Sequence, residues 1–209
     1  MVTPKYSTVF LLVNIFIFVH SHSNQLKWES ASTISSDQLD PAGKEGEFTY
    51  YVARGSVRKN WLNGKSLVMN GEHVAYTPYA GQEAEATDFQ VLVVPAGTTS
   101  WVASGGNNLP NYWIAGGYHP AVNETTVICR AFHAGHLIVG NGLKSYGACY
   151  TEYLNKVHPY SSYEILVLND YGIATGAAKV PRVPGPIFVS SSTTKTAPMY
   201  FRWPKVLLD

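Results

Sequence analysis

Charged residues are scarce in this 209-residue chain, where Asp, Glu, Lys and Arg together make up 14% of the sequence. Lys5 is the only charged residue before position 24, and the remainder carries 14 basic against 14 acidic residues. A protein without net charge has no overall electrostatic attraction for nucleic acid or anionic lipid. The charge balance therefore argues against a nucleic-acid partner.

The sequence also lacks a long amphipathic helix, since no extended stretch keeps an apolar period of 3.6 residues. In its place stand 18 Gly, 12 Pro, 14 Tyr and 5 Trp, a composition typical of short strands and tight turns. We expect an all-β fold and exclude a helical bundle. An aromatic content of 13% excludes a chain that is disordered throughout.

Catalytic motifs are missing as well, because the chain has no G-x-S-x-G, H-E-x-x-H or C-x-x-C pattern. His133 and His136 have no third ligand near them in sequence and are expected to be surface histidines rather than a metal pair. Glu83 and Glu85 are expected to lie in an exposed loop. We predict no enzymatic activity, no cofactor and no metal site.

One hydrophobic run is present, from Val9 to Val19, and it is shorter than the roughly 20 residues that span a bilayer. Lys5 precedes it, and the small residues Ser21 and Ser23 follow it. This arrangement predicts a secretory signal peptide over residues 1–23, with an uncleaved signal anchor as the alternative. We expect a secreted, extracellular protein that leaves the membrane after cleavage.

Two further features are expected consequences of export. Cys129 and Cys149, the two cysteines of the chain, are expected to form a disulfide in an oxidising compartment, with two free buried thiols as the alternative. Asn123 begins an Asn-Glu-Thr sequon and is a predicted N-glycosylation site.

An internal repeat organises the chain. Arg54 recurs as Arg130, and Gly64 recurs as Gly140, both 76 positions later. Offsets of 73 or 74 relate Trp28 to Trp101, Tyr76 to Tyr150, Tyr79 to Tyr153 and residues 89–93 to 163–167. Chance identities would scatter these offsets, so we predict a tandem duplication.

The duplication predicts two repeats, over residues 24–96 and 97–169, built of short antiparallel strands. One repeat has too few strands to cover its own edges, so the two are expected to share one compact core. Residues 170–209 form a Pro/Ser/Thr-rich extension that either docks on the repeats or acts as a linker. Its apolar stretch at 199–203 is a candidate edge strand.

The alignment of the repeats also predicts roles for single residues. Both cysteines fall opposite alanines, Ala53 and Ala75, so we expect them to be cross-strand neighbours. Their disulfide would then be an optional staple worth on the order of 3 kcal/mol. Arg54 and Arg130 recur in mid-strand and are expected to make internal structural hydrogen bonds.

The repeat residues resemble a known family. The second repeat has Trp101-Val102, Leu109-Pro110, Ala115-Gly116-Gly117-Tyr118, Cys129-Arg130-Ala131 and Tyr163-Glu164-Ile165-Leu166. The first has Trp28, Ala53-Arg54, Gly64-Lys65, Tyr79-Ala80-Gly81-Gln82-Glu83 and Phe89-Gln90-Val91-Leu92. Over residues 28–169 the chain is similar to the DM-nine repeat family, found in tandem in invertebrate proteins.

The resemblance implies an all-β module whose better-understood members are mannose-binding lectins that act in pattern recognition and can dimerise. In those lectins an Asp after Ala-Gly-Tyr and the Lys of Gly-Lys contact sugar hydroxyls. The corresponding lysine here is Lys65, and the nearest candidate for its acidic partner is Glu47. In the second repeat His119 and Asn141 occupy the two positions, so hydrogen-bonding groups remain without the charge pair.

A sugar site also needs an aromatic ring against the apolar face of the sugar. Tyr79, Tyr118 and Tyr153 are candidates, with strand packing as their alternative role, and Lys65 has the alternative role of a solvated turn lysine. The resemblance implies a secreted pattern-recognition protein of innate immunity that binds mannose-type glycans, with a homodimer as a possible assembly. The alternative is a secreted interaction or structural protein that keeps the fold with a degraded sugar site.

Overall fold

The computed structural model describes residues 25–58, 60–177 and 187–191. The predicted signal peptide at 1–23 and the candidate edge strand at 199–203 lie outside these residues. Within the described part, every helical segment is too short to span a bilayer.

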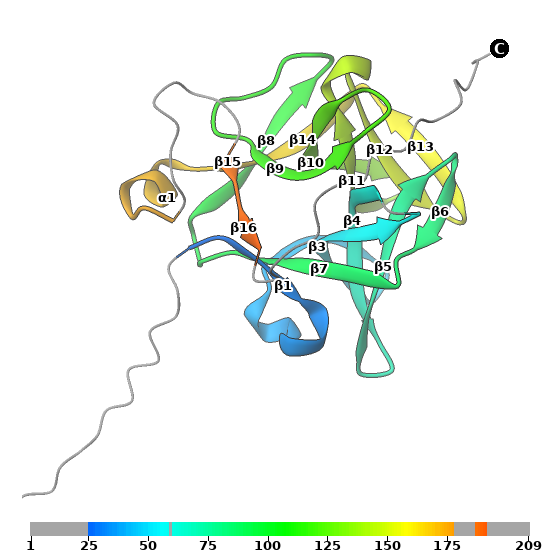
Figure 1. Ribbon diagram of the computed structural model, residues 1–209, viewed down its shortest axis with the longest axis horizontal. Coiled ribbons are helices and arrows are strands. Elements are labelled where there is room, and N and C mark those ends of the chain that lie inside the picture. Colours follow the sequence, from blue (N-terminus) through cyan, green and yellow to red (C-terminus); the bar gives the residue numbers. More distant parts are fainter. Residues whose placement is uncertain (1–24, 59, 178–186, 192–209) are drawn as a thin grey trace, which may run out of the picture.

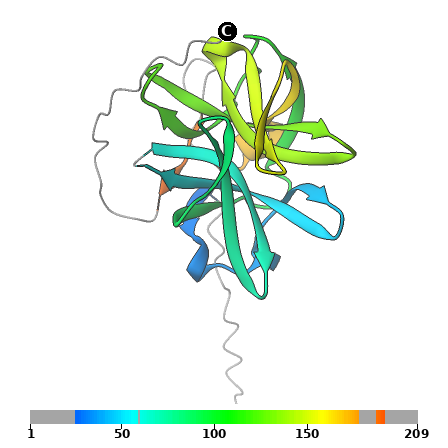
Figure 2. The same cartoon turned by 90° about the vertical axis from the view of Figure 1, so that its right-hand side faces the viewer.

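Two sets of seven strands make up most of the fold, with the first set lower and the second set upper in Figure 2. The first half has β1 (Lys27–Ser30), β2 (Pro41–Glu45), β3 (Phe48–Val57), β4 (Asn60–Met69), β5 (Glu72–Tyr79), β6 (Gln82–Glu85) and β7 (Asp88–Val93). The second half has β8 (Thr99–Gly105), β9 (Ile114–His119), β10 (Glu124–His133), β11 (His136–Leu143), β12 (Ala148–Tyr153), β13 (Lys156–Tyr160) and β14 (Ser162–Leu168).

The remaining elements are short. They are the 3-10 turns η1 (Ala31–Thr33), η2 (Ser36–Gln38) and η3 (Lys144–Tyr146), the helix α1 (Asp170–Ala174), and the strands β15 (Ile187–Phe188) and β16 (Ser190–Ser191). The prediction of an all-β fold is therefore confirmed.

Strand pairing follows the same scheme in both halves. The central strand β3 pairs with β2, β4 and β7, and its counterpart β10 pairs with β9, β11 and β14. The chain of pairs β4–β5–β6 recurs as β11–β12–β13, and β1–β7 recurs as β8–β14. All these pairs are antiparallel. The recurrence supports the predicted duplication, whose boundaries at 24–96 and 97–169 stay a prediction.

The core has three parts rather than one. The largest buried cluster takes side chains from both halves and from the tail, among them Trp28, Ile128 and Ile187, each fully buried. A second cluster lies within the first half around Val91, and a third lies within the second half around Ile165. The expected shared core thus exists, and each half adds a small core of its own.

The repeated arginines bind in the same way in each half. The guanidinium of Arg54 lies 4.5 Å from the centre of the Trp28 ring, and that of Arg130 lies 4.3 Å from the centre of the Trp101 ring. Each Nε donates to a side chain of the neighbouring strand, Gln90 for Arg54 and Glu164 for Arg130. The prediction of internal structural hydrogen bonds is confirmed.

The same two arginines also join the halves. Arg54 Nη1 donates to the carbonyl of Gly116 at 3.1 Å, and Arg130 Nη1 donates to the carbonyl of Ala42 at 2.9 Å. The two acceptors are themselves 74 residues apart. Each half thus gives the other the same hydrogen bond, which is a pseudo-two-fold relation. Burial lowers the pKa of Arg54 to about 10.

Glycines allow the halves to approach closely. A Cβ on Gly43 would lie 2.1 Å from the carbonyl oxygen of Leu137, and a Cβ on Gly117 would lie 2.2 Å from that of Trp61. Such distances are far below van der Waals contact, so only glycine fits at either position. At the first of these contacts β2 pairs with β11, through Lys44 and Leu137.

The predicted disulfide between Cys129 and Cys149 is present, with the two Cα atoms 6.0 Å apart. The expectation that the cysteines are cross-strand neighbours is wrong. Cys129 on β10 pairs with Gly140, and Cys149 on β12 pairs with Gly142, so β11 runs between the two strands. A Cβ on Gly142 of β11 would lie 3.4 Å from the Cys129 sulfur, so this glycine lies beside the disulfide where it passes β11.

The described part of the tail docks on both halves. β15 pairs in parallel with β9, and β16 pairs in parallel with β1, which Figure 1 shows as an orange segment beside both strands. Ile187 is fully buried, and the carbonyl of Ala177 accepts a hydrogen bond from the backbone N–H of Leu26 at 2.9 Å. Of the two interpretations of the extension, docking holds for residues 170–177 and 187–191.

Candidate functional site

Lys65, the lysine expected at the sugar site, lies in the middle of β4 and is 4% exposed. The alternative of a solvated turn lysine is therefore wrong. Its ammonium donates to the carbonyl of Glu152 on β12 at 2.8 Å and pairs with Glu83 on β6 at 2.9 Å. The lysine joins a strand of the second half to two strands of the first.

Glu83 was expected to lie in an exposed loop, and this expectation is wrong. It lies on a strand, its side chain is 14% exposed, and Oε1 faces the Lys65 ammonium. Its second carboxylate oxygen accepts a hydrogen bond from the backbone N–H of Asn155 at 3.2 Å, which fixes the orientation of the group. Glu85, two residues on, is exposed.

Glu152 adds a second carboxyl group beside Lys65. It is fully buried, and neither of its carboxyl oxygens has a hydrogen-bond partner among the described residues. Burial raises the pKa of Glu152 well above its ordinary value, against the opposing effect of the Lys65 charge. The nearby Glu83 charge also raises the pKa of Glu152, so burial and a like charge both favour its neutral form.

Two tyrosines flank the ammonium. The Lys65 Nζ lies 5.1 Å from the centre of the Tyr50 ring and 5.9 Å from that of Tyr76. The Tyr50 hydroxyl in turn donates a short hydrogen bond to the carboxylate of Glu45, at the end of β2. We call Lys65, Glu83, Glu45 and Tyr50 the Lys65 site.

The acidic partner expected from the sequence, Glu47, is not part of this arrangement. Glu47 is exposed in the turn between β2 and β3, whereas the carboxylate that Tyr50 joins to the lysine is that of Glu45. The repeat itself carried the missed signal. Gly43 and Gly117 occupy equivalent positions, so His119 of the second half corresponds to Glu45, 74 residues earlier.

The second half holds its two candidate residues in different surroundings. Asn141 is 3% exposed, and its Oδ1 accepts a hydrogen bond from the backbone N–H of Asn63 at 3.2 Å. His119, at the end of β9, has a buried Nδ1 without a hydrogen-bond partner among the described residues, and burial lowers its pKa. The Asn141 side chain therefore serves the contact between the halves.

Asn123, the predicted glycosylation site, is exposed in the turn between β9 and β10. The Tyr118 hydroxyl donates a short hydrogen bond to its side-chain oxygen. Its exposure in a turn suits attachment of a glycan, which stays a prediction.

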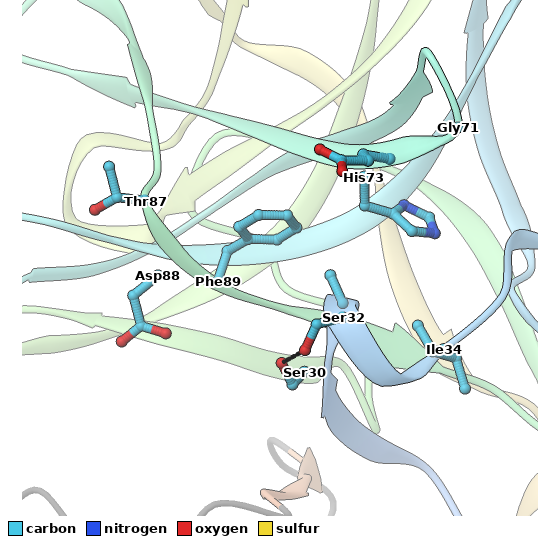
Figure 3. Close-up of a pocket in the computed structure, with 10 residues that line it drawn as sticks. Ser30, Ser32, Ile34, Gly71, His73, Thr87, Asp88 and Phe89 are labelled. Atoms are coloured by element: carbon cyan, nitrogen blue, oxygen red, sulfur yellow. Dashed lines mark hydrogen bonds between the residues drawn. The ribbon is translucent and has the colours of Figure 1, made fainter.

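A pocket of about 590 Å³ lies elsewhere in the first half, between the end of β1, η1 and the starts of β5 and β7 (Figure 3). The Phe89 ring, the His73 ring and the hydroxyls of Ser30 and Ser32 line it, with Asp88 at its rim. No lysine or arginine is among the described residues that line this pocket. It therefore lacks the paired charges that the Lys65 site offers. The described residues also hold no group of three or more potential metal ligands.

Comparison with known families gives a match. The sequence profile of the DM9 repeat family covers residues 44–158, which is more than half of the chain and includes the Lys65 site. A comparison with curated proteins gives no match.

Proposed function

Because this chain belongs to the DM9 (DM-nine) repeat family, whose members are binding domains compatible with a carbohydrate-binding role, we propose that it is a lectin for mannose-type glycans. The observation that carries the proposal is the charge pair of Lys65 and Glu83, with Glu45 linked to it through Tyr50.

The chemistry of these groups matches vicinal sugar hydroxyls. An ammonium donates to hydroxyl oxygens, a carboxylate accepts hydroxyl protons, and hydrogen bonds to charged groups are the strong ones. Lys65 uses two of its three N–H donors on Glu152 and Glu83, which leaves one for a ligand. Since the lysine is nearly buried, Glu45 and Glu83 form the part of the site that a sugar meets first.

Secretion belongs to the same proposal. The Cys129–Cys149 disulfide is of a kind that persists in oxidising compartments, and Asn123 is exposed where a glycan would be attached. Because a single shallow site binds weakly, a homodimer that presents two Lys65 sites would give the avidity that pattern recognition needs.

The second half favours an alternative for part of the molecule. Asn141 is bound to Asn63, and the partner position holds His119 rather than a carboxylate. A protein that keeps this fold and recognises a protein partner would not need a lysine and a carboxylate at these two positions. The proposal therefore places the charged sugar site at Lys65 and not at the equivalent position of the second half.

The test is a glycan-binding screen of the purified full-length protein beside Lys65→Ala and Glu45→Gln. We expect mannose-type glycans to bind, and each change to weaken binding at least about tenfold, because each removes a charge-assisted hydrogen bond. The matched control is Lys44→Ala, since Lys44 is an exposed lysine on β2, and this variant should bind glycans as the unchanged protein does.

Glu45→Gln guards against a variant that fails to fold, because it keeps the shape of the side chain while removing its charge. If the folded protein binds no glycan, or if both changes leave glycan binding intact, the proposal is wrong. Capture of a protein partner that is indifferent to Lys65→Ala would favour the alternative.

A further inference from the structure

Five aromatic rings form a continuous row on the second half, at the ends of β10 to β13. They are His136, Tyr153, His133, His158 and Tyr160, which we call the ring row. The first three follow one another, and the His133 ring contacts both His158 and Tyr160. The centre of the His136 ring lies 5.6 Å from that of Tyr153, and the His133 ring lies 4.9 Å from Tyr153 and 4.2 Å from His158. All five side chains are half-buried.

Strand register places these rings on one face. His133 pairs directly with His136, and opposed residues of an antiparallel pair point to the same side. On β13, His158 and Tyr160 alternate with the exposed Pro159 and share their face. The His133 ring also forms a short hydrogen bond with the Tyr160 hydroxyl. The five rings therefore form one cluster on a single face of the four strands β10 to β13.

The ring row begins where the Lys65 site ends. Lys44 of β2 pairs with Leu137 of β11, and Glu45 and His136 are the residues next to this pair on the two strands. At the other side, Tyr153 directly follows Glu152, whose carbonyl accepts the Lys65 hydrogen bond. The strands that carry the charged groups and the rings thus adjoin at two points, one on β11 and one on β12, where the Glu152 and Tyr153 side chains point to opposite faces.

The chemistry of the row favours a sugar over a metal ion. The described residues contain no group of three or more potential metal ligands, and the row combines three imidazole rings with two phenol rings. Burial, followed by the nearby His158 and His136, lowers the pKa of His133, so its ring is neutral at neutral pH. Aromatic rings can pack against the apolar face of a pyranose.

We propose that the ring row is a second subsite, at which the next unit of an oligosaccharide packs while the first unit binds at the Lys65 site. This inference rests on the proposed function. It names the ligand class as an oligosaccharide rather than a single sugar, since the row of rings is longer than one pyranose.

The test compares the affinity of the full-length protein for methyl mannoside and for a linear mannotriose. We expect mannotriose to bind about three- to tenfold more tightly, which corresponds to one ring-packing contact. His158→Ala should abolish that advantage and leave the affinity for methyl mannoside unchanged, and His158→Phe should retain it because a ring is kept.

The matched control is Phe132→Ala on the same hairpin. Phe132 is 68% exposed and, as the neighbour of His133 on β10, points to the opposite face, so mannotriose should keep its advantage. A mannotriose affinity equal to that of methyl mannoside, or an advantage that survives His158→Ala, overturns the second subsite alone. If neither sugar binds to the folded protein, the proposed function fails and the subsite fails with it.

Discussion

Lys65 shows what the sequence could and could not predict about a single residue. Its place in the Gly64-Lys65 pair, which the resemblance to the DM-nine family singles out, identified it as a candidate sugar contact. Its burial depends on the Glu152 carbonyl, 87 residues away, and on Glu83. No local pattern reports such contacts. Arg54 and Arg130 were predictable because the repeat shows both in mid-strand, where a charged side chain needs internal partners.

Glu152 gives a prediction about pH at the same scale. Because burial raises the pKa of Glu152 above its value in the unfolded chain, its neutral form stabilises the fold fully below that unfolded value. This stabilisation is lost as pH rises through the raised pKa. Glu152→Gln cannot ionise, so it should be increasingly more stable than the unchanged protein as pH rises from about 4.5.

Urea unfolding at a series of pH values measures this difference. Glu85→Gln is the control, since Glu85 is an exposed carboxylate on the neighbouring strand β6 and its replacement should leave the pH profile nearly unchanged. A stability difference between Glu152→Gln and the unchanged protein that is flat with pH would contradict the buried neutral carboxyl.

At the scale of elements, Asn-Gly and Ala-Gly pairs are local turn signals, and Asn70-Gly71 and Ala80-Gly81 do form turns. Asn63-Gly64 and Asn141-Gly142 carry the same signal, yet they lie inside β4 and β11. The pairing of β2 with β11 was not predictable, because it joins positions about ninety residues apart in the chain. The disulfide was predictable from two cysteines in an exported chain, but its route across β11 depends on how strongly the sheet curls.

Gly43→Ala tests the close contact between β2 and β11. An added methyl would lie 2.1 Å from the Leu137 carbonyl oxygen, so the strands would have to separate. We expect a loss of about 1–3 kcal/mol in the free energy of unfolding, measured by denaturant titration. Gly71→Ala is the comparison. Its new methyl meets no atom within 4 Å, and only its positive φ of 86° carries a cost, about 1 kcal/mol.

Removal of the disulfide should leave a folded protein. Ala53 and Ala75, the first-half equivalents of the cysteines, are both buried in a core cluster, so this position tolerates small side chains. Cys129→Ala combined with Cys149→Ala should lower the free energy of unfolding by about 3 kcal/mol. The far-UV spectrum should be retained. A chain that no longer folds would show that the disulfide is required and not optional.

At the scale of the whole molecule, the duplication predicted two units and a shared core, and the largest apolar cluster does take residues from both halves. The contribution of the tail was open, because a Pro/Ser/Thr-rich composition fits a linker as well as a docked segment. Burial of Ile187 shows that the described part of the tail is docked. The sequence could not predict this, because a two-residue strand is too short to show an apolar alternation.

Ile187→Ala measures what the docked tail contributes. The side chain is fully buried in the cluster that both halves share, so its truncation should cost about 2–5 kcal/mol. Phe188→Ala is the control, since the adjacent Phe188 is 68% exposed and should change stability by less than about 0.5 kcal/mol. Equal thermal shifts for the two variants would mean that the tail adds nothing to the core.

The contacts between the halves also set an order of events during synthesis. β1 lies near the start of the described chain, and its parallel partner β16 is made near the end. Arg54 can form its hydrogen bond, and β2 can pair, only after Gly116 and β11 have been synthesised. A ribosome that has completed only the first half therefore holds a segment with open strand edges and unmet hydrogen bonds. The native first half can be completed only after the last strands have left the exit tunnel.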